Sequence, residues 1–436
     1  MQADILIENG WILTMDPENT VFEKGSLAIT GESISAIGRA EDLSHIRARE
    51  KVDAGGCIVL PGLVNVHTHA SMTLFRGLAD DLPLMRWLED HIFPAEARLT
   101  PELVRLGAEL ACLEMMASGT TTFCDMYLFE NSVAEAADAA GMRAVVGEVL
   151  YDFPSPCYGP IEKGFLHVEE MADRWKDHPR ITIALKPHSP YLCAPELLCR
   201  AFDMAEAHNL PFVIHLAETA AETETIKKRY GRSPLAHLAD LGVLSKRTLA
   251  AHCVKMDEAD IALFATKGSA VAHNPQSNMK LASGIAPVPA FLKAGITVGL
   301  GTDGAASNND LNILSEMRSA ALLHKVNMED PTVLDARTIL RMATIDGAKC
   351  LGLDGITGSL ERGKQADVIL MDTGKPHMTP LHNPFSQVVY AAGRNDIRDI
   401  FVAGKGIYRN RCHTTLDAND ICHRVREAVA GFHKKV

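Results

Sequence analysis

The sequence has no surplus of basic residues. It contains 43 Lys and Arg against 55 Asp and Glu, which gives a formal net charge of -12 at pH 7. A protein that follows a nucleic-acid backbone needs a positively charged stripe to neutralise the phosphates, and no segment of this sequence supplies one. We therefore expect no nucleic acid among its partners.

Long apolar runs are also missing. No stretch reaches the roughly 18 consecutive apolar residues that a membrane-spanning helix needs. Residues 1–8 carry Asp4 and Glu8 among their apolar side chains, and no basic segment precedes an uninterrupted apolar one, as it would in a secretion signal. We expect a cytoplasmic protein with no membrane partner.

Two common binding patterns are absent as well. The 10 cysteines are scattered and form no Cys-x-x-Cys pair of the kind that zinc ribbons and redox motifs use, so we expect free thiols. A Gly-rich phosphate-binding turn is also missing. An open, doubly wound sheet would normally carry such a turn after its first strand, so that fold is only the second choice.

The sequence does contain enough apolar material for a large core, with 47% hydrophobic residues over a length of 436. This length fits one large domain plus a small one. Segments 4–60 and 366–405 hold short, β-sized apolar runs beside Gly, Asn or Asp. We predict a small β-sandwich built from both ends, residues 1–58 and 358–436 with a C-terminal helix, around a domain at 59–357.

The middle of the chain alternates between amphipathic segments of helix length and apolar, β-branched runs, which is typical of parallel strands joined by helices. Helices are predicted at 100–117, 194–208 and 311–325. Eight strands are predicted to end near Val66, Phe123, Val146, Leu185, Ile214, Ala251, Ala272 and Leu300. Eight such units predict an α/β fold with a closed (β/α)8 TIM-type barrel.

Histidines and a carboxylate close several of these apolar runs. His67 and His69 end the first strand at positions i and i+2, which share one face of a strand. His215, His252 and Asp303 close three later runs. Active sites of such barrels lie at the carboxyl ends of the strands. We therefore predict that these side chains converge on a metal ion.

Imidazoles with one carboxylate suit zinc or iron(II) and leave a position for water. We expect one divalent metal per chain, zinc before iron(II), which lowers the pKa of bound water from about 15.7 toward about 7. Glu218 follows His215 by three residues. We predict that Glu218 delivers protons to a substrate nitrogen and does not bind the metal.

Long, collinear motifs surround these residues. They are His67-Thr-His69, His215-Leu-Ala-Glu218, Ala251-His-Cys253, His-Asn-Pro-Gln-Ser-Asn-Met-Lys-Leu at 273–281 and Gly-Thr-Asp-Gly-Ala-Ala-Ser-Asn-Asn at 301–309. Further strings lie at 60–65 and 358–367. Over nearly the whole chain, the sequence resembles the amidohydrolase superfamily, and within it the 5'-methylthioadenosine/S-adenosylhomocysteine deaminase family.

The resemblance implies hydrolytic deamination of the adenine 6-amino group of 5'-methylthioadenosine or S-adenosylhomocysteine, with release of ammonia. It implies that the metal ligands are His67, His69, His215 and Asp303. It implies that the catalytic residues are Glu218, His252 and Asp303. It implies that the substrate-binding residues are Trp87, Glu96, His188, Glu218 and Asp303.

The same resemblance assigns each residue a role. Glu218 would carry the proton to purine N1, His252 would orient the attacking water, and Asp303 would take the proton of that water. Glu96 would accept hydrogen bonds from the ribose hydroxyls, and His188 would contact the nucleoside. The expected partner is therefore a small purine nucleoside.

The sequence departs from the family at two positions. Where some members carry an arginine for the homocysteine carboxylate, this chain has Glu148. An acid facing the pocket would repel that carboxylate, which favours a neutral 5'-thioether nucleoside. Lys186 shares a strand face with His188 and falls where binuclear members carry a bridging lysine.

Alternatives therefore stay open. Lys186 favours a two-metal cyclic amidase of the same fold. The same mechanism could act on another ring, such as that of adenosine, 5'-deoxyadenosine, guanine, cytosine or a triazine. A barrel that only binds ligands is the alternative from another class. The sequence also leaves open a homo-oligomer and the role of the loop 151–165, which is a candidate lid.

Overall fold

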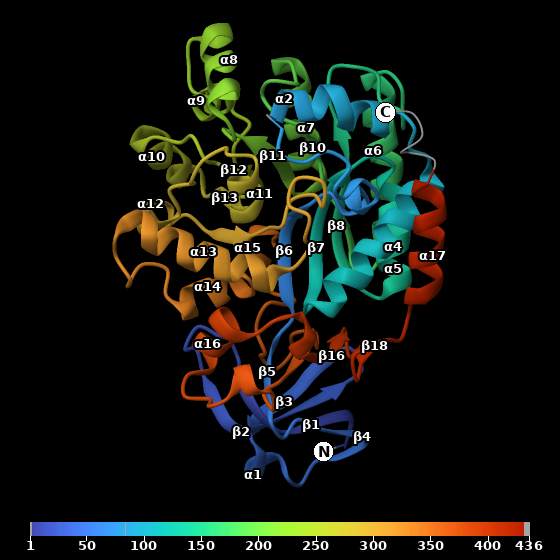
Figure 1. Cartoon of the computed structure of the whole chain (residues 1–436), viewed down its shortest axis with the longest axis vertical. Helices are drawn as coiled ribbons and strands as arrows, with labels where there is room; N and C mark the ends of the chain where they lie inside the picture. The colour runs from blue at the N-terminus through green and yellow to red at the C-terminus, as the bar shows by residue number, and fades with distance from the viewer. Residues whose placement is uncertain (1, 83, 431–436) are drawn as a thin grey trace.

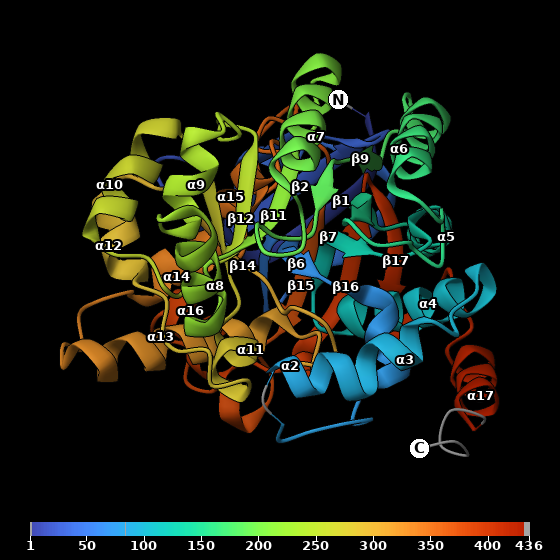
Figure 2. The same ribbon diagram turned by 90° about the horizontal axis from the view of Figure 1, so that it is seen from above.

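The chain folds into a large barrel and a smaller sheet domain, which lie at the top and the bottom of Figure 1. The computed structural model describes residues 2–82 and 84–430. Figure 2 looks down on the barrel and shows its strands at the centre inside a ring of helices. The prediction of an α/β fold with a TIM-type barrel is confirmed. Within the described residues, no helix has the length and apolar character to cross a membrane.

The sheet domain consists of nine strands from both ends of the chain. Its strands are β1 (Gln2–Leu13), β2 (Val21–Thr30), β3 (Ser33–Arg39), β4 (Arg47–Asp53), β5 (Cys57–Pro61), β15 (Val368–Asp372), β16 (Ile397–Val402), β17 (Lys405–Arg409) and β18 (Cys412–His413). Their order is β18-β17-β16-β15-β5-β1-β2-β3, with β4 paired to β1. The two ends of the chain meet where β5 and β15 pair antiparallel.

This sheet curls over a core of its own. Ile29 of β2 and Phe401 of β16, from strands far apart in the sheet, belong to one buried apolar cluster. The backbone N–H of Ile34 in β3 donates to the carbonyl of Lys364, 2.9 Å away, just before β15. A curled sheet of this kind matches the β-sandwich predicted from both ends. The boundaries 1–58, 59–357 and 358–436 themselves stay a prediction.

The barrel strands are parallel and occupy eight positions, because β9 and β10 are two halves of one strand. They are β6 (Leu63–Thr68), β7 (Thr120–Tyr127), β8 (Arg143–Leu150), β9 (Ile181–Ile183), β10 (Lys186–Pro187), β11 (Phe212–Leu216), β12 (Thr248–His252), β13 (Ala270–His273) and β14 (Val298–Leu300). The strands from β6 to β10 form one sheet and those from β11 to β14 another. A β-bridge between Leu185 and Phe212 joins these two sheets. Where the last barrel strand meets the first, the N–H of Asp303, which follows β14, donates to the carbonyl of His67 in β6, 3.0 Å away.

Helices cover the outside of the barrel and its mouth. The α-helices are α1 (Ala40–Leu43), α2 (Leu84–Trp87), α3 (Phe93–Glu96), α4 (Pro101–Ala117), α5 (Glu130–Ala140), α6 (Ile161–Trp175), α7 (Pro195–His208), α8 (Ala220–Tyr230), α9 (Pro234–Asp240), α10 (Glu258–Lys267), α11 (Pro275–Lys280), α12 (Val288–Lys293), α13 (Ile313–Met328), α14 (Ala336–Met342), α15 (Ile345–Cys350), α16 (Pro384–Ser386) and α17 (Ala418–Val429). The other helical turns are η1 (Ala70–Phe75), η2 (Leu88–Ile92), η3 (Pro376–Met378), η4 (Gln387–Ala391) and η5 (Arg394–Asp396).

The three helices predicted from the sequence are present, and local signals mark the start of α4 and the end of α7. Thr100 precedes α4, and its side chain accepts a hydrogen bond from the N–H of Leu103, with Pro101 at the first helical position. Helix α7 ends at Asn209, which adopts the left-handed conformation that closes many helices. Helix α13 starts two residues later and ends three residues later than the predicted segment 311–325.

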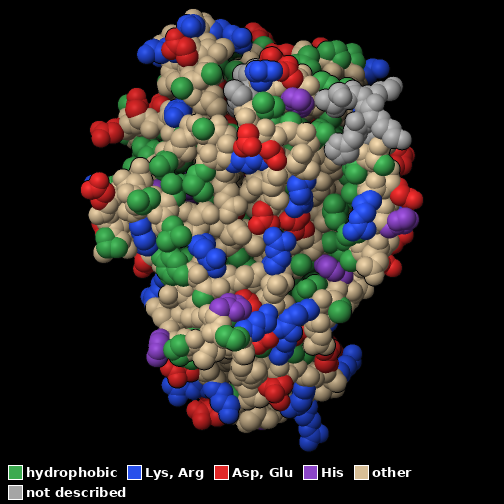
Figure 3. Space-filling model, in the orientation of Figure 1, with side chains coloured by type: hydrophobic (Ala, Val, Ile, Leu, Met, Phe, Trp, Pro, Cys, Tyr) green, Lys and Arg blue, Asp and Glu red, His purple; other side chains and the backbone are tan. Residues whose placement is uncertain are grey.

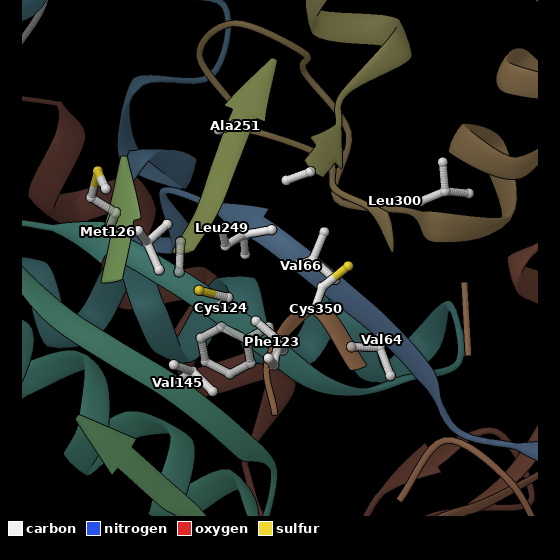
Figure 4. Close-up of a cluster of buried hydrophobic side chains, with 14 of the residues drawn as sticks. Val64, Val66, Phe123, Cys124, Met126, Val145, Leu249, Ala251, Leu300 and Cys350 are labelled. Carbon is white, nitrogen blue, oxygen red and sulfur yellow. The ribbon is translucent and has the colours of Figure 1, made fainter. Parts of the chain in front are cut away.

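Packing around β6 determines which side chains reach the barrel interior. Val64 and Val66 are buried in the apolar cluster of Figure 4, together with Cys350 from α15. A Cβ atom on Gly299 would lie 2.7 Å from Val66 Cγ1, so this glycine allows close packing. Because neighbouring side chains of a strand point to opposite faces, the apolar packing of Val66 directs His67 the other way.

Contacts also tie the barrel to the C-terminal segment. The guanidinium of Arg143 in β8 pairs with the buried carboxylate of Asp367, with Nε and Oδ2 3.1 Å apart. Helix α17 leaves the sheet domain and lies beside α4, as Figures 1 and 2 show, with Ile421 and Val425 buried. Acidic and basic side chains are interspersed over the face shown in Figure 3. The C-terminal segment therefore packs on both domains.

Candidate active site and metal centre

A cavity of about 840 Å³, open to solvent, lies at the carboxyl ends of the barrel strands. Eight of the nine predicted site residues line this cavity: His69, Trp87, Glu96, His188, His215, Glu218, His252 and Asp303. The ninth, His67, is fully buried next to them. The folded chain thus brings together residues that are spread over more than 230 positions of the sequence.

Ligand atoms of His67, His69 and Asp303 lie within 4.8 Å of one another, and so do ligand atoms of His67, His215 and His252. Asp303 Oδ1 lies 3.2 Å from His69 Nε2 and 3.6 Å from His67 Nε2. The ring centres of His67 and His215 are 5.0 Å apart, and those of His69 and His215 are 5.4 Å apart. Three imidazoles and one carboxylate around one point are a donor set that divalent zinc accepts.

The hydrogen bonding of these histidines fits a metal ion. Both ring nitrogens of buried His67 have no hydrogen-bond partner within the described residues. His69 Nδ1 bonds to the carbonyl of Met126, and His215 Nδ1 bonds to the carbonyl of His188 at 2.8 Å. These bonds to backbone oxygens fix the ring tautomer and direct each Nε2 lone pair to the centre, as in established metal sites.

Asp303 is held in place from several sides. Its Oδ2 accepts hydrogen bonds from the hydroxyls of Ser277 at 2.6 Å and Ser307 at 3.0 Å, and its Oδ1 accepts from the N–H of Gly304. Burial alone would raise the pKa of Asp303, but the neighbouring imidazoles hold that pKa well below its ordinary value. The carboxylate is therefore ionised and positioned as a ligand.

Glu218 and His252 face each other across the same cavity. His252 Nε2 lies 3.9 Å from Glu218 Oε2, and His252 Nδ1 bonds to Asn278 Oδ1 at 2.9 Å. The Ser283 hydroxyl reaches Glu218 Oε1 at 3.5 Å. Burial raises the pKa of Glu218 above its ordinary value. A carboxyl with a raised pKa next to a cavity is suited to exchange protons near neutral pH.

The backbone is strained where these side chains leave their strands. Positive φ angles occur at Ala217 (50°), His252 (73°), Cys253 (50°) and Asp303 (61°). Non-glycine residues adopt this region at a cost of about 1–3 kcal/mol each, and such strain gathers at functional sites. The cross-strand hydrogen bond from Cys253 N to Leu216 O, 3.0 Å long, helps to hold this geometry.

The three residues predicted to bind the nucleoside also lie at the cavity. Trp87 is buried at the end of α2, and Glu96 is half-buried at the end of α3. Burial raises the pKa of Glu96 to about 7. Burial lowers the pKa of His188 to about 3, so this imidazole is neutral. The cavity therefore offers a ring surface, a carboxyl and a neutral imidazole.

Two supporting groups were not predicted from the sequence. Asn278 orients His252. Its segment, 273–281, was recognised as a motif, but Asn278 was given no role. The Glu222 carboxylate accepts hydrogen bonds from the N–H groups of Ala217 at 3.0 Å and Glu218 at 2.7 Å. The signal for Glu222 was present, because Thr219 and Glu222 have the Thr-x-x-Glu spacing of a helix capping box.

The repulsion expected of Glu148 required this side chain to face the cavity, and the structure does not meet that condition. This side chain does not line the cavity but is fully buried behind it. Its carboxylate accepts hydrogen bonds from the N–H groups of Phe129 at 3.1 Å and Glu130 at 2.9 Å, at the start of α5. Repulsion between Glu148 and a substrate carboxylate therefore has no geometric basis.

Arg143 and Lys186 also point away from the cavity. Arg143 pairs with Asp367 between the barrel and the sheet domain. The Lys186 ammonium donates hydrogen bonds to the carbonyl of Val145 at 2.9 Å and to the carbonyl of Asp125, and it lies 3.2 Å from Cys124 Sγ. These contacts satisfy a buried ammonium group without a metal. They give no support to a bridging role for Lys186.

The loop after β8 contributes to the cavity wall. Tyr151 and Phe153 line the cavity, and their rings stack with centres 3.9 Å apart. The predicted loop 151–165 is shorter in the structure, because helix α6 already begins at Ile161. The cavity wall therefore depends on the conformation of residues 151–160.

Comparisons with known proteins agree with this geometry. The model of the amidohydrolase family matches residues 58–407. A 5-methylthioadenosine/S-adenosylhomocysteine deaminase of Syntrophobacter fumaroxidans is 55% identical over 98% of this chain and 97% of its own length. A protein of the same name from Nitratidesulfovibrio vulgaris is 48% identical over 98% of this chain and 97% of its own length.

A solved structure is also similar over the full length. An adenosine deaminase of Xanthomonas campestris with bound zinc is 39% identical, with a TM-score of 0.98 over 100% of this chain and 99% of that chain. On these grounds, together with the barrel and its strand-end histidines, the chain belongs to the amidohydrolase family, among relatives that carry the name 5-methylthioadenosine/S-adenosylhomocysteine deaminase.

Proposed function

We propose that this protein is a metal-dependent deaminase that hydrolyses the adenine 6-amino group of 5'-methylthioadenosine and S-adenosylhomocysteine. The observation that carries the proposal is the position of Glu218, a buried carboxyl in the cavity, 3.9 Å from His252 and beside the cluster of candidate ligands. The identity of 55% with a relative of that name over nearly the full chain supports the substrate class.

We assign one divalent ion to His67, His69, His215 and Asp303. Zinc is the first choice, because the Xanthomonas campestris relative is described with bound zinc. Iron(II) accepts the same ligands. When bound, such an ion acts as a Lewis acid that lowers the pKa of water to about 7. The unpartnered ring nitrogens of His67 are consistent with this assignment.

The residues around the cavity supply the proton transfers of the reaction. His252, held by Asn278, orients the attacking water toward purine C6. The Asp303 carboxylate takes a proton from that water, while Glu218 protonates N1 so that the ring can accept the new bond. The C6–nitrogen bond then breaks as the proton held by Asp303 passes to the amino group, which leaves as ammonia, and the proton of the new C6 hydroxyl returns to Glu218. One water molecule is consumed for each ammonia released.

We assign nucleoside binding to Trp87, Glu96 and His188. The Trp87 ring offers a flat apolar surface, which suits packing against the substrate. The Glu96 carboxylate can accept two hydrogen bonds, as a ribose cis-diol requires. His188, kept neutral by burial, can donate or accept one hydrogen bond with the nucleoside.

We further propose that a neutral 5'-thioether is preferred. The apolar and aromatic part of the cavity wall includes Leu88, Ile92, Phe93, Tyr151, Phe153 and Leu192. Within the described part of the chain, no Lys or Arg lines this cavity. A homocysteine carboxylate would therefore lose water without gaining a cationic partner, which costs binding free energy.

Ammonia release from a substrate panel tests both proposals. The panel contains 5'-methylthioadenosine, S-adenosylhomocysteine, adenosine, 5'-deoxyadenosine, guanine, cytosine and a triazine. We expect the highest kcat/KM for 5'-methylthioadenosine. Turnover of S-adenosylhomocysteine at equal kcat/KM contradicts the preference for a neutral side group. Lack of activity on every adenine nucleoside contradicts the proposed function.

The triazine belongs in this panel for a specific reason. An atrazine chlorohydrolase of Arthrobacter aurescens complexed with zinc is 26% identical to this chain, with a TM-score of 0.91 over 98% of this chain and 100% of that chain. The same barrel thus occurs in a relative named for another ring. Release of chloride from atrazine, with no release of ammonia from any adenine nucleoside, would assign this chain to that second activity.

A further inference from the structure

A second group of metal-binding side chains lies behind the cavity wall. It contains Glu148 from β8, Cys157 from the loop after that strand and His167 from α6. One ligand atom from each of the three residues lies within 4.8 Å of the other two. We propose that this Glu-Cys-His group is a binding site for a zinc-like divalent cation that fastens the loop 151–160 to the barrel.

The distances match those around a tetrahedral zinc ion. His167 Nε2 lies 3.6 Å from Glu148 Oε2 and 3.7 Å from Cys157 Sγ. Zinc bonds of about 2.0–2.1 Å to nitrogen and oxygen and about 2.3 Å to sulfur place neighbouring ligands about 3.3–3.6 Å apart. Small adjustments therefore bring all three atoms to bonding distance of one ion.

A hydrogen-bonded relay explains the arrangement less well. In a nucleophile–histidine–carboxylate relay, the histidine uses its two ring nitrogens for two different partners. Here the thiol of Cys157 and the carboxylate of Glu148 both approach the same atom, Nε2 of His167. A single ring nitrogen has either one proton or one lone pair. Without a cation, the Glu148 carboxylate accepts hydrogen bonds from both the Cys157 thiol and His167. A cation at the centre would replace these two bonds and interact with all three groups at once.

The surroundings orient the ligands and leave them accessible. Glu148 receives hydrogen bonds from the N–H groups of Phe129 and Glu130, which use two of its roughly four lone-pair positions. Such bonds fix a metal-binding carboxylate from behind. Cys157 is half-buried and the His167 side chain is 23% exposed, so an ion can enter from solvent.

The thiolate of Cys157 and the neutral imidazole of His167 are the forms that bind a metal ion, and the Glu148 carboxylate raises the pKa of both groups, so binding displaces the protons that they carry. Burial and the nearby Glu148 carboxylate raise the pKa of the Cys157 thiol well above its ordinary value, so the thiol keeps its proton when no cation is present. On binding, the cation forms bonds to Cys157 Sγ, His167 Nε2 and a Glu148 oxygen, and the displaced thiol and imidazole protons pass to solvent. Occupancy therefore increases with pH.

The site connects three segments that shape the cavity wall. Its loop is stiffened by the paired backbones of Ser155 and Gly159 and by the hydroxyl of Tyr158, which donates to the carbonyl of Val149 at 3.1 Å. The same loop carries Tyr151 and Phe153 of the cavity wall. A cation bound to Glu148, Cys157 and His167 would hold the loop against β8 and α6.

Metal content is the first test. Full-length protein is equilibrated with excess zinc, desalted and analysed for zinc per chain. We expect two ions in the wild type, one in Cys157→Ser and two in Cys199→Ser. Cys199 is a matched control, because it is also a half-buried thiol but contacts only the carbonyl of Leu241 among the contacts given for its sulfur.

Thiol protection is the second test and does not depend on enzymatic activity. Zinc at ten times its dissociation constant should slow alkylation of Cys157 by about tenfold in the wild type, measured by mass spectrometry. His167→Gln should remove this protection while retaining one zinc per chain and its circular dichroism spectrum. Zinc should also slow proteolysis in the loop 151–160 of the wild type and not of Cys157→Ser.

Three outcomes would overturn the inference. The first is an equal zinc content in the wild type and Cys157→Ser at saturation, whatever the occupancy of the cavity site. The second is a second zinc that persists in both Cys157→Ser and His167→Gln. The third is alkylation of Cys157 at the same rate with and without zinc. None of these results depends on whether the protein is a deaminase.

Discussion

The imidazole of His252 and the carboxylate of Glu218 face each other across the cavity, with Nε2 and Oε2 3.9 Å apart. Asn278 holds the other ring nitrogen of His252, so the imidazole is fixed in one orientation. The gap between the two side chains is too long for a direct hydrogen bond. Glu218 Oε2 and His252 Nε2 are therefore both available to the substrate and the attacking water at the same end of the cavity.

Replacement of Glu218 by Gln should lower kcat by about 10²–10⁴-fold, the range for loss of general acid–base catalysis. The amide keeps the size of the side chain but cannot exchange the proton. Metal content at the cavity should stay the same, because Glu218 is not a proposed ligand. Glu224→Gln is the control, since Glu224 is exposed on α8, the helix that follows Glu218. Normal turnover by Glu218→Gln shows that Glu218 has another role.

The KM for 5'-methylthioadenosine should depend on the ionisation of Glu96. Burial raises the pKa of this carboxyl to about 7. As the pH falls from about 8 to about 6, the ionised fraction decreases about tenfold, so KM should increase by up to about tenfold. The carboxylate is the form that accepts both hydroxyl hydrogen bonds, which gives the direction of the effect.

The matched variant for this prediction is Glu96→Gln. Its KM for 5'-methylthioadenosine should be higher than that of the wild type and should not change with pH near 7. The matched substrate is 2',3'-dideoxyadenosine, which lacks both ribose hydroxyls. Its KM should not change with the ionisation of Glu96 in the wild type. An equal pH dependence of KM for both substrates would show that Glu96 does not bind the ribose.

Replacement of Lys186 by Met should leave the metal at the cavity in place. The ammonium donates to the carbonyls of Val145 and Asp125, so its loss should lower the free energy of unfolding by about 1–3 kcal/mol. Metal content is best measured in a Cys157→Ser background, which removes the proposed Glu-Cys-His site. Loss of a tightly held ion with Lys186 would favour the two-metal amidase instead.

Replacement of Arg143 by Ala should destabilise the protein by about 3–5 kcal/mol, because it leaves the buried carboxylate of Asp367 without its cation. Urea unfolding followed by circular dichroism measures the change. The kcat of the remaining folded protein should stay unchanged, since the pair lies away from the cavity. A double variant, Arg143→Met with Asp367→Leu, should recover much of the loss. Equal destabilisation in the double variant would rule out the ion pair as the cause.

The sequence by itself determined the barrel and the set of candidate ligands. Parallel strands appear as apolar, β-branched runs, and a polar residue at the end of such a run lies at the barrel mouth whichever strand carries it. For His67 and His69 the spacing alone places both rings on one face. Such inferences depend on local periodicity and fold class, both of which are visible in the chain.

Only the tertiary structure decided the direction of side chains whose neighbours come from distant segments. Glu148 turns toward the start of α5, and Lys186 turns toward backbone carbonyls, because these groups satisfy their charges there. The meeting of Cys157 and His167 with Glu148 depends on how the loop 151–160 and α6 fold back on β8. Periodicity carries no information on such contacts, because they form between surfaces that pack only in the folded chain.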